Sequence, residues 1–559
     1  MQHLLSFRER DQVIEKMARD GIDVLVVGGG VTGSGVALEA ASRGYSVGLI
    51  DKNDFASGTS SKSTKLVHGG IRYLPQFDFA LVHEGLVERG LLARNAPHLV
   101  KPLGFVLPLY KENKRPMGTP IVPPFGIGMS LLMEAGLLLY DTMAGKLGIG
   151  RHKRISRDRI RELAPSLKQD GLTAAFIYYD GQTDDTLLTL SILRTAAERG
   201  AALANYVELQ GFELQGGLIV AARVRDTVSG TTRLIRCKSV INAGGAFAGR
   251  IEEMAGKSTI VIRPAKGVHI TVSRDALPIS DHAVVLPETP DGRLLFLVPW
   301  NTRVTIGTTD TKGGDVDNPR ADALDIQYLL ETTNHYLDKK LSHADIISAW
   351  AGYRPLISAS GAVGETKSLS RTHIVHDGPG GMVTITGGKL TSYRRMAQDT
   401  LDHLQRQRGQ QVTHFTEHLA LDGADDYIAC AADITAAAHG FGWNEDVVRR
   451  LAQYGSESRK LLEWCLQDAS LARQLASDLP YTFVEVRYAC RHEMAVHLED
   501  VMIRRLHVNF EDRSRGFASM QKIAELMAAE LGWSPAETQM QIDRYRRLVE
   551  ADATPLPPG

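Results

Sequence analysis

The N-terminal part of the chain alternates apolar runs with a helical repeat. The segment 22–30 (IDVLVVGGG) is an apolar run that ends in three glycines, and 31–44 (VTGSGVALEAASRG) has small residues at helical spacing. A second apolar run, 45–52 (YSVGLIDK), reaches an acid near its end. Two apolar runs around a helix within about 30 residues predict a strand–helix–strand unit of the kind that opens a parallel sheet.

The hydrophobic pattern changes twice along the rest of the chain. Five segments have the apolar pattern of strands, the last two as a hairpin: 101–111, 218–226, 232–245, 292–300 and 302–310. Helical spacing predicts helices at 126–146 and 180–201. From about residue 401 the strand pattern stops and helical spacing continues. We therefore expect a domain boundary near 400–425.

Composition indicates a soluble globular protein of more than one domain. The chain has 559 residues, 43% hydrophobic and 23% charged, with a formal net charge of -1. This balance argues against a broad basic surface, so we expect no nucleic-acid partner. The four cysteines are far apart and predict free thiols. The apolar windows 22–41 and 126–145 contain acidic residues, so neither is expected to span a membrane.

The glycines between the first strand and helix form a dinucleotide motif. In Gly28-x-Gly30-x-x-Gly33, the first glycine allows a tight turn, the second lets backbone approach a pyrophosphate, and the third lets the helix pack closely. Asp51 ends the second strand, where an acid accepts a hydrogen bond from a ribose 2′-hydroxyl. The glycine pattern alone does not separate NAD from FAD. Two later segments, 59–74 and 239–247, favour FAD.

The first of these segments, TSSKSTKLVHGGIRYL over 59–74, is rich in hydrogen-bond donors. It has three cations, five hydroxyl residues in its first half, a Gly-Gly pair and no acid. The second, SVINAGGAF over 239–247, is an apolar strand that ends in small residues, where backbone can pass close to a flat cofactor. We expect the donor-rich segment to hold an anion.

With these segments in place, residues 23–74 resemble the start of the FAD-dependent glycerol-3-phosphate dehydrogenases, respiratory enzymes of the glycine/D-amino-acid oxidase superfamily. Further matches follow in order along nearly the whole chain: YYDGQTDDTLL (178–188), INAGGAFAG (241–249), RPAKGVHI (263–270), IGTTDT (306–311), WAGYRPL (350–356), TGGKLTSYR (386–394) and YACRHEMAVHLEDVMIRR (488–505). The family often has NATGPW at the strand end, where this chain has Ala246 and Phe247 in place of the proline and tryptophan.

The resemblance implies an α/β fold with three parts. A discontinuous Rossmann-like FAD-binding domain would comprise about 20–95, 165–265 and 345–400. An antiparallel-sheet substrate domain would comprise about 96–164 and 266–344, and an all-helical C-terminal cap domain would comprise 401–559. The cofactor implied is non-covalent FAD.

The implied reaction oxidises sn-glycerol 3-phosphate to dihydroxyacetone phosphate, which needs a phosphate clamp and a base for the 2-hydroxyl proton. The planar fork of arginine matches phosphate oxygens, so Arg72, beside Tyr73, and Arg354 are the clamp candidates. Lys389 would touch substrate or flavin. His269 is the favoured base, because the ordinary pKa of histidine suits this task. His68 is the competing candidate, and a nearby water is the other alternative. The expected catalytic residues are therefore His269, Arg354 and Lys389.

The resemblance also implies a set of residues around the cofactor. Within the donor-rich segment, the hydroxyls and Lys65 would serve FAD, and His68 with the following glycines would pass under the flavin. The expected FAD-binding residues are Gly28, Gly30, Gly33, Asp51, Thr59, Ser60, Ser61, Lys65, His68, Gly70, Val207, Ala243, Gly244, Gly388, Leu390 and Thr391. No metal is expected, because the two histidines of RHEMAVH are five residues apart and do not form HExxH.

The electron acceptor has two expected alternatives. The family reading implies ubiquinone or menaquinone and a cytoplasmic protein attached peripherally to the inner face of the cell membrane, with a homodimer also considered. The alternative is an α-glycerophosphate oxidase that passes electrons to O2 and makes hydrogen peroxide. An oxidase of another substrate, such as a D-amino acid, and a flavin-binding sensor without turnover are less favoured. Four arginines (487, 491, 504 and 505) are expected on or near one long helix, facing solvent, a dimer partner or anionic lipid.

Overall fold

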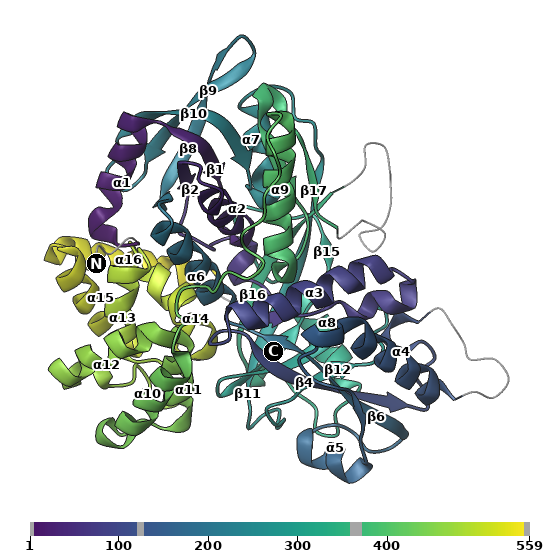
Figure 1. Ribbon diagram of the computed structural model, residues 1–559. Coiled ribbons are helices and arrows are strands. Elements are labelled where there is room, and N and C mark those ends of the chain that lie inside the picture. The colour runs from purple at the N-terminus through teal and green to yellow at the C-terminus, as the bar shows by residue number, and fades with distance from the viewer. Residues whose placement is uncertain (1–4, 120–127, 358–371, 553–559) are drawn as a thin grey trace.

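A computed structural model describes residues 5–119, 128–357 and 372–552 (Figure 1). It contains two large sheets and a C-terminal group of helices, which confirms the α/β class and the helical C-terminal region. Strands and helices form where the sequence pattern predicts them in all seven segments named above. None of the described helices combines the length and apolar composition needed to cross a bilayer.

The first sheet is built on the predicted strand–helix–strand unit. Its central strands are parallel, and it has the order β17 (Ile374–Asp377), β18 (Val383–Thr386), β10 (Thr232–Asn242), β1 (Ile22–Val27), β2 (Val47–Ile50) and β7 (Ala202–Ala204). β17 is antiparallel to β18, and the hairpin of β8 (Val207–Gln215) and β9 (Leu218–Asp226) extends β10.

The helices of this sheet are α1 (Phe7–Asp20), α2 (Val31–Ser42), α6 (Asp185–Glu198), α7 (Ala248–Glu253) and α9 (Tyr393–Gln407). α2 packs between α6 and α9. This contact is close because Gly35 faces the Tyr393 ring, where a Cβ on the glycine would lie 2.7 Å from a ring carbon. The small residues at helical spacing are thus a packing requirement.

The second sheet is mostly antiparallel. Its order is β15 (Thr311–Lys312), β11 (Ile262–Ser273), β14 (Arg303–Gly307), β13 (Leu295–Trp300), β12 (Ala283–Leu286), β4 (Lys101–Tyr110), β6 (Leu172–Gln182) and β3 (Leu66–Val67), with β16 (Ile346–Ile357) paired to β11 and β5 (Lys153–Arg154) to β6. The predicted hairpin is β13–β14. β6 and β16 lie in segments assigned to the FAD-binding domain, so strands on both sides of the predicted boundaries share this sheet.

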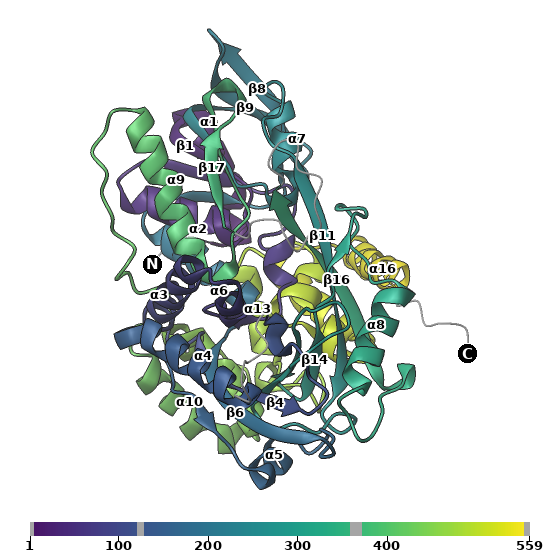
Figure 2. The same ribbon diagram turned by 90° about the vertical axis from the view of Figure 1, so that its right-hand side faces the viewer.

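Alternate residues of the second sheet face two different helical layers. Phe105 packs in the core formed with α3 (Phe79–Asn95) and α4 (Met129–Ala144), whereas Val106 packs with α5 (Arg157–Leu163) and α8 (Ala323–Asn334). This period of two is the expected alternation of side chains along a strand. Figure 2 shows α3 and α4 on the side of the sheet away from α8.

The C-terminal helices, drawn in green to yellow in Figure 1, lie against α1 and α6. They are α10 (Tyr427–Phe441), α11 (Glu445–Leu451), α12 (Ser458–Gln467), α13 (Phe483–His492), α14 (Val508–Glu511), α15 (Phe517–Leu531) and α16 (Pro535–Ala551). Among the described residues that follow β18, no further strand forms.

The predicted long helix that carries four arginines is wrong. α13 ends at His492, and Asp500–Arg505 form a separate π-helical turn. Arg504 and Arg505 do not face solvent or lipid, because both are buried and donate to the carboxylate of Asp54. Their pairing partner lies 450 residues away along the chain, which helical spacing does not reveal.

Candidate active site

The turn from β1 into α2 accepts glycine alone at two positions. A Cβ on Gly28, whose φ is 112°, would lie 2.5 Å from the carbonyl oxygen of Ala243, and one on Gly33 would lie 1.8 Å from the oxygen of Gly28. Gly30 is the N-cap of α2 and carries no capping side chain. Instead, the Val31 N–H donates to the Ser60 hydroxyl over 2.9 Å. The helix N-terminus and Ser60 therefore lie together, as a pyrophosphate site requires.

Asp51 closes the other side of this turn. Its carboxylate accepts hydrogen bonds from the backbone N–H of Gly29 (2.7 Å) and of Asn53 (2.9 Å), and its backbone oxygen accepts from the N–H of Val207 (2.7 Å). Burial raises the pKa of Asp51 to about 6, although the two backbone donors oppose the rise. The acid is thus placed beside the glycine turn and is only partly ionised in mildly acidic solution.

This pKa predicts that FAD binding to the apoprotein weakens in acid. Below about pH 6 the protonated Asp51 no longer offers a carboxylate to the ribose, so FAD affinity at pH 5 should be about tenfold lower than at pH 8. The apoprotein shows the opposite trend in stability. Because the folded pKa is raised, this carboxyl's stabilisation is present below about pH 4 and is lost as pH rises through about 6. Fluorescence titration of apoprotein with FAD measures the affinity.

Asp51→Asn is the control for this titration. Its FAD affinity should be lower at pH 8 and nearly constant between pH 5 and pH 8. An equal loss of affinity in acid by the variant and the wild type would assign the effect to another group.

The end of β10 approaches the same turn. The N–H of Ala243 donates to the oxygen of Val27 (2.9 Å), and the N–H of Gly244 donates to the side chain of Asn242 (3.1 Å). At the departure from the family pattern, the Phe247 ring receives the Lys52 ammonium at 3.7 Å from the centroid. The small residues Ala243 and Gly244 therefore remain beside the glycine turn despite the altered sequence that follows them.

The donor-rich segment 59–74 runs from this turn towards the second sheet. Thr59 donates its hydroxyl to the backbone oxygen of Tyr353 (2.5 Å). The hydroxyl of Ser61 is buried and has no hydrogen-bond partner in the described part of the chain. A buried orphan hydroxyl requires an explanation, and a bound polar group supplies one.

The second half of the segment meets the start of α9. The N–H of His68 donates to the hydroxyl of Thr391 over 3.1 Å, and that hydroxyl lies 3.2 Å from the backbone oxygen of His68. Thr391 and Leu390 belong to a short 3-10 turn that leads into α9. Gly388, with φ of 77°, packs on Met396, so a Cβ there would lie 2.4 Å from the sulfur. Two segments more than 300 residues apart are thereby joined.

Three of the predicted substrate residues gather around one ring. The ammonium of Lys389 lies 4.4 Å from the centre of the Tyr73 ring, and the guanidinium of Arg72 lies 5.0 Å from it. Gly70 adopts a left-handed conformation (φ 83°), and a Cβ there would lie 3.4 Å from the Lys389 ammonium. The two cations thus converge on one place, which suits a dianion.

His269 and Arg354 lie on the paired strands β11 and β16. His269 is buried, stacks on Trp350 with ring centres 4.1 Å apart, and has its Nε2 2.9 Å from the hydroxyl of Thr64. Its Nδ1 has no hydrogen-bond partner among the described residues. Burial, followed by the nearby charges of Arg354 and Lys65, lowers the pKa of His269 well below its ordinary value. The imidazole is therefore neutral near pH 7, and it is a weaker base than the ordinary histidine on which the sequence-based expectation relied.

The guanidinium of Arg354 is held by the loop after β14. It donates to the backbone oxygen of Thr309 (3.2 Å) and the hydroxyl of Thr308 (3.1 Å), and it lies 3.6 Å from the carboxylate of Asp310. A quarter of the side chain remains exposed. The arginine is oriented by this loop and still reaches solvent, which suits the predicted role of binding substrate.

Lys65 has acidic and histidine neighbours that the sequence did not predict. Its ammonium donates to Asp185 over 2.6 Å and lies 3.4 Å from Nε2 of His507, in a buried cluster. Sequence reasoning missed this cluster, which also contains Thr64, Asp184 and Arg450. The pair of acids in YYDGQTDDTLL was its visible signal, but the partners come from distant parts of the chain. A direct contact of Lys65 with FAD stays a prediction.

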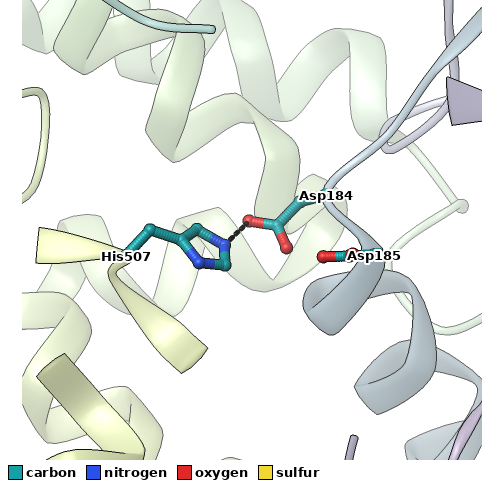
Figure 3. A group of neighbouring side chains, drawn as sticks. All are labelled: Asp184, Asp185 and His507. Atoms are coloured by element: carbon teal, nitrogen blue, oxygen red, sulfur yellow. Dashed lines mark hydrogen bonds and ion pairs between the residues drawn. The ribbon is translucent and has the colours of Figure 1, made fainter. Parts of the chain in front are cut away.

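Asp184, Asp185 and His507 form the one group with metal-like spacing in the described residues (Figure 3). Their candidate ligand atoms lie within 4.8 Å of one another. Hydrogen-bond donors already contact both carboxylates: Asp184 accepts from Arg450 and His507, each over 3.0 Å, and Asp185 accepts from Lys65. The arrangement is that of a satisfied ion network.

The residues around the glycine turn fit a dinucleotide. The glycines leave a cradle that a Cβ would fill, the α2 N-terminus carries Ser60, and Ser61 offers a buried hydroxyl. A family described as "FAD dependent oxidoreductase" matches residues 23–394, and one described as "C-terminal domain of alpha-glycerophosphate oxidase" matches residues 414–538. The protein is an FAD-dependent oxidoreductase.

Comparison with individual relatives identifies the family within this class. Glycerol-3-phosphate dehydrogenase of Mycobacterium leprae is 37% identical over 551 residues, which cover 98% of this chain and 91% of the relative. The human mitochondrial glycerol-3-phosphate dehydrogenase is 34% identical over 554 residues, 94% of this chain and 73% of the relative. The structure of glycerol-3-phosphate dehydrogenase from Bacillus halodurans complexed with FAD matches with a TM-score of 0.79 and 28% identity, covering 99% of this chain and 100% of that chain. The chain belongs to the FAD-dependent glycerol-3-phosphate dehydrogenase family.

Proposed function

We propose that the enzyme oxidises sn-glycerol 3-phosphate to dihydroxyacetone phosphate and passes the electrons to a membrane quinone. FAD, when bound, accepts the hydride from C2 of the substrate. The observation that carries the proposal is His269, a buried, neutral imidazole with an unpartnered Nδ1, on a strand paired with the one that bears Arg354. Such a group can take the proton of the 2-hydroxyl as the hydride leaves.

The phosphate clamp is assigned to Arg354 and to the two cations at the Tyr73 ring. Arg354 would bind phosphate oxygens through its fork, since Thr308 and Thr309 hold the guanidinium in one orientation. Arg72 and Lys389, gathered at Tyr73, would supply the remaining positive charge. A fixed phosphate orients C2 and its hydroxyl, which is how distant binding interactions accelerate the chemical step.

The test of the proposed reaction is anaerobic mixing of the holoenzyme with glycerol 3-phosphate. The yellow absorbance of the flavin should bleach, and glycerol without the phosphate should bleach it far more slowly. Persistent absorbance with glycerol 3-phosphate rejects the reaction, and equal rates with both compounds reject the phosphate clamp. Oxygen uptake during turnover without quinone would favour the oxidase alternative.

Peripheral membrane attachment is supported by an exposed apolar patch. It consists of Phe77, Phe79, Leu131, Leu138 and Leu139, which are between 41% and 59% exposed. They lie on α4 and on the turn into α3, and these two helices lie side by side (Figures 1 and 2). Phe77 is exposed in a left-handed backbone conformation (φ 59°), which costs a non-glycine residue free energy. Large exposed apolar side chains of this kind mark interaction surfaces.

The patch adjoins the predicted substrate residues. Arg72 and Tyr73 belong to the 3-10 turn Ile71–Gln76, which directly precedes Phe77 and contacts α4. A membrane surface at the patch would place a dissolved quinone on the same side of the molecule as this turn. The position of the patch beside this turn favours a quinone dissolved in the membrane as the electron acceptor over O2, which needs no membrane surface.

The double variant Leu131→Glu/Leu138→Glu should bind quinone-containing vesicles at least tenfold more weakly. Each leucine loses its burial in lipid and a charge is added, and a loss of about 1.4 kcal/mol is tenfold in affinity. Flavin reduction by glycerol 3-phosphate should be unchanged. Vesicle flotation measures the binding. Leu324→Glu on α8, where the leucine is 76% exposed, is the matched control, and equal losses in both proteins would place the membrane surface elsewhere.

A further inference from the structure

A buried chain of polar contacts connects the C-terminal helices to His269. We propose that these helices position His269 through Asp185, His507 and the turn Ser63–Lys65, an inference that rests on the proposed role of His269 as base. The residues in this series of contacts act through Thr64, which contacts His269. They are positioning residues for the reaction.

The link at the active-site end is Thr64. Its hydroxyl lies 2.9 Å from Nε2 of His269, while Nδ1 has no partner in the described part of the chain. A threonine hydroxyl can donate or accept, so its orientation selects which imidazole nitrogen bears the proton. A shift of Thr64 would therefore change both the tautomer and the direction of the ring.

The next link is the grip of Asp185 on the turn that carries Thr64. One oxygen of Asp185 accepts from the N–H of Ser63 (3.1 Å) and from its hydroxyl (2.7 Å), and the other accepts from the ammonium of Lys65 (2.6 Å). The backbone oxygen of Lys65 accepts from the N–H of Thr183 (3.0 Å). Asp185 thus holds the residues on both sides of Thr64.

The turn needs such a grip because its backbone is strained. Lys65 has a φ of 59°, in the left-handed region that side chains other than glycine rarely adopt. Holding a non-glycine residue there costs free energy, because Cβ comes close to the following carbonyl oxygen. Without its partners the turn would relax, and Thr64 would move away from His269.

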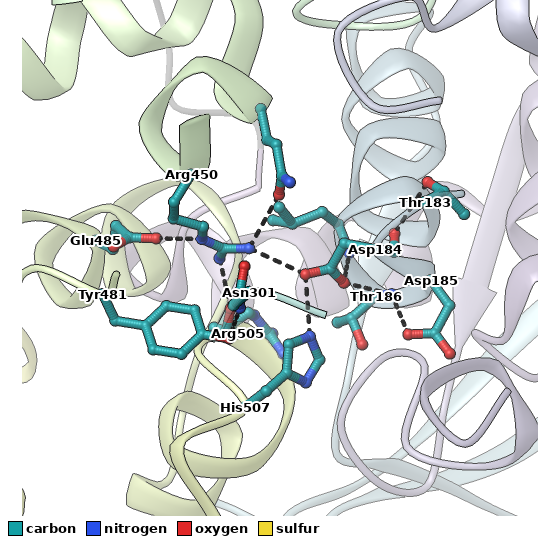
Figure 4. A network of polar contacts seen from close by, with 12 residues as sticks. Thr183, Asp184, Asp185, Thr186, Asn301, Arg450, Tyr481, Glu485, Arg505 and His507 are labelled. Carbon is teal, nitrogen blue, oxygen red and sulfur yellow. Dashed lines mark hydrogen bonds and ion pairs between the residues drawn. The ribbon is translucent and has the colours of Figure 1, made fainter. Parts of the chain in front are cut away.

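The last link is supplied by the C-terminal helices (Figure 4). Asp184, the N-cap of α6, accepts from His507 and from Arg450, each over 3.0 Å. Arg450 is itself held by Glu485 (2.7 Å) and donates to the backbone oxygen of Arg505 (2.8 Å). Although burial alone would raise the pKa of Asp184, His507, Lys65 and Arg450 hold it well below its ordinary value.

This network fixes the start of α6 and therefore Asp185. His507 also lies 3.4 Å from the Lys65 ammonium, so it contacts Asp184 and the cation that pairs with Asp185. The acids, His507 and Arg450 are all buried, and contacts of this kind are strong and directional where water is excluded. The position of the C-terminal helices is thereby transmitted to one turn in the active site.

The experiment is a double-mutant cycle in the holoenzyme with Asp185→Asn and Thr64→Val. Each variant should reduce the anaerobic rate of flavin reduction at saturating glycerol 3-phosphate about tenfold, and the half-saturating substrate concentration should stay within twofold. Because both changes act through the same contact, the double variant should be reduced at about the rate of the slower single variant. Flavin content and the thermal midpoint are recorded for each protein.

Asp226→Asn is the control, because it breaks another buried pair, with Arg10 at 2.6 Å, far along the chain from the turn. It should leave the reduction rate unchanged. Should Asp185→Asn not fold, His507→Gln replaces it in the cycle, with a three- to tenfold loss expected. The proposal is overturned if the rate loss of the double variant equals the product of the two single losses. It is also overturned if the thermal midpoint changes and the reduction rate does not. Failure of the wild type to be reduced rejects the proposed reaction instead.

Discussion

In the His269→Gln variant, glycerol 3-phosphate should reduce the flavin about 10²- to 10⁴-fold more slowly than in the wild type. This factor is the usual contribution of a positioned general base. Glutamine keeps a polar group near Thr64 but cannot accept the 2-hydroxyl proton. Stopped-flow absorbance under anaerobic conditions measures the rate. Flavin content should be unchanged, because His269 lies on β11 and not at the glycine turn.

The pH dependence gives an independent check of the same residue. The pKa of His269 is well below its ordinary value, so the neutral imidazole persists as pH falls through 6.5. The wild-type reduction rate should therefore not decline between pH 8 and pH 6.5 through protonation of this group. The control for His269→Gln is His335→Gln, a histidine substitution on the exposed surface. A full rate in His269→Gln would assign the base to another group, such as a bound water.

Arg354→Ala should raise the half-saturating concentration of glycerol 3-phosphate about 10- to 150-fold. A hydrogen bond to a charged group contributes about 1.5 to 3 kcal/mol, and 1.4 kcal/mol corresponds to tenfold. FAD should remain bound, because the contacts of Arg354 are with Thr308, Thr309 and Asp310 in the loop after β14 and not with the glycine turn. Flavin reduction rates over a range of substrate concentrations give the half-saturating concentration, and the flavin content shows whether FAD stays bound.

Arg354→Lys separates charge from geometry. Lysine keeps the positive charge but loses the planar fork, so its half-saturating concentration should lie between those of the alanine variant and the wild type. Loss of FAD from Arg354→Ala would show that the arginine serves the cofactor. An unchanged half-saturating concentration would remove it from the phosphate clamp.

Local patterns in the sequence predicted the strand–helix–strand unit on which the first sheet is built and the glycine turn within it. The glycines 28, 30 and 33, the strand before them and Asp51 lie within one strand–helix–strand unit, so their contacts follow from short-range geometry. The convergence of Arg72, Tyr73 and Lys389 needed the family resemblance, because more than 300 residues separate the last from the others. The individual roles of these residues stay predictions that the variants above test.

Contacts between distant charges could not be predicted. Arg504 and Arg505 appear in the sequence as part of an amphipathic run with alternating charges, yet they are buried against Asp54. Lys65 appears as a loop cation among hydroxyls, yet it binds Asp185. Spacing along the chain shows which face of a helix a residue occupies, but it does not show which other segment covers that face.

The pairing of Asp54 with Arg504 also bears on how the chain is made. The acid leaves the ribosome 450 residues before its arginine, an interval of roughly 20 to 90 s at common rates of synthesis. During that time the nascent N-terminal part carries carboxylates, at Asp54 and Asp184, whose cationic partners do not yet exist. The ion pairs of Asp54 can therefore form only after residues 504 and 505 have left the ribosome, so a late part of the chain completes the surroundings of an early one.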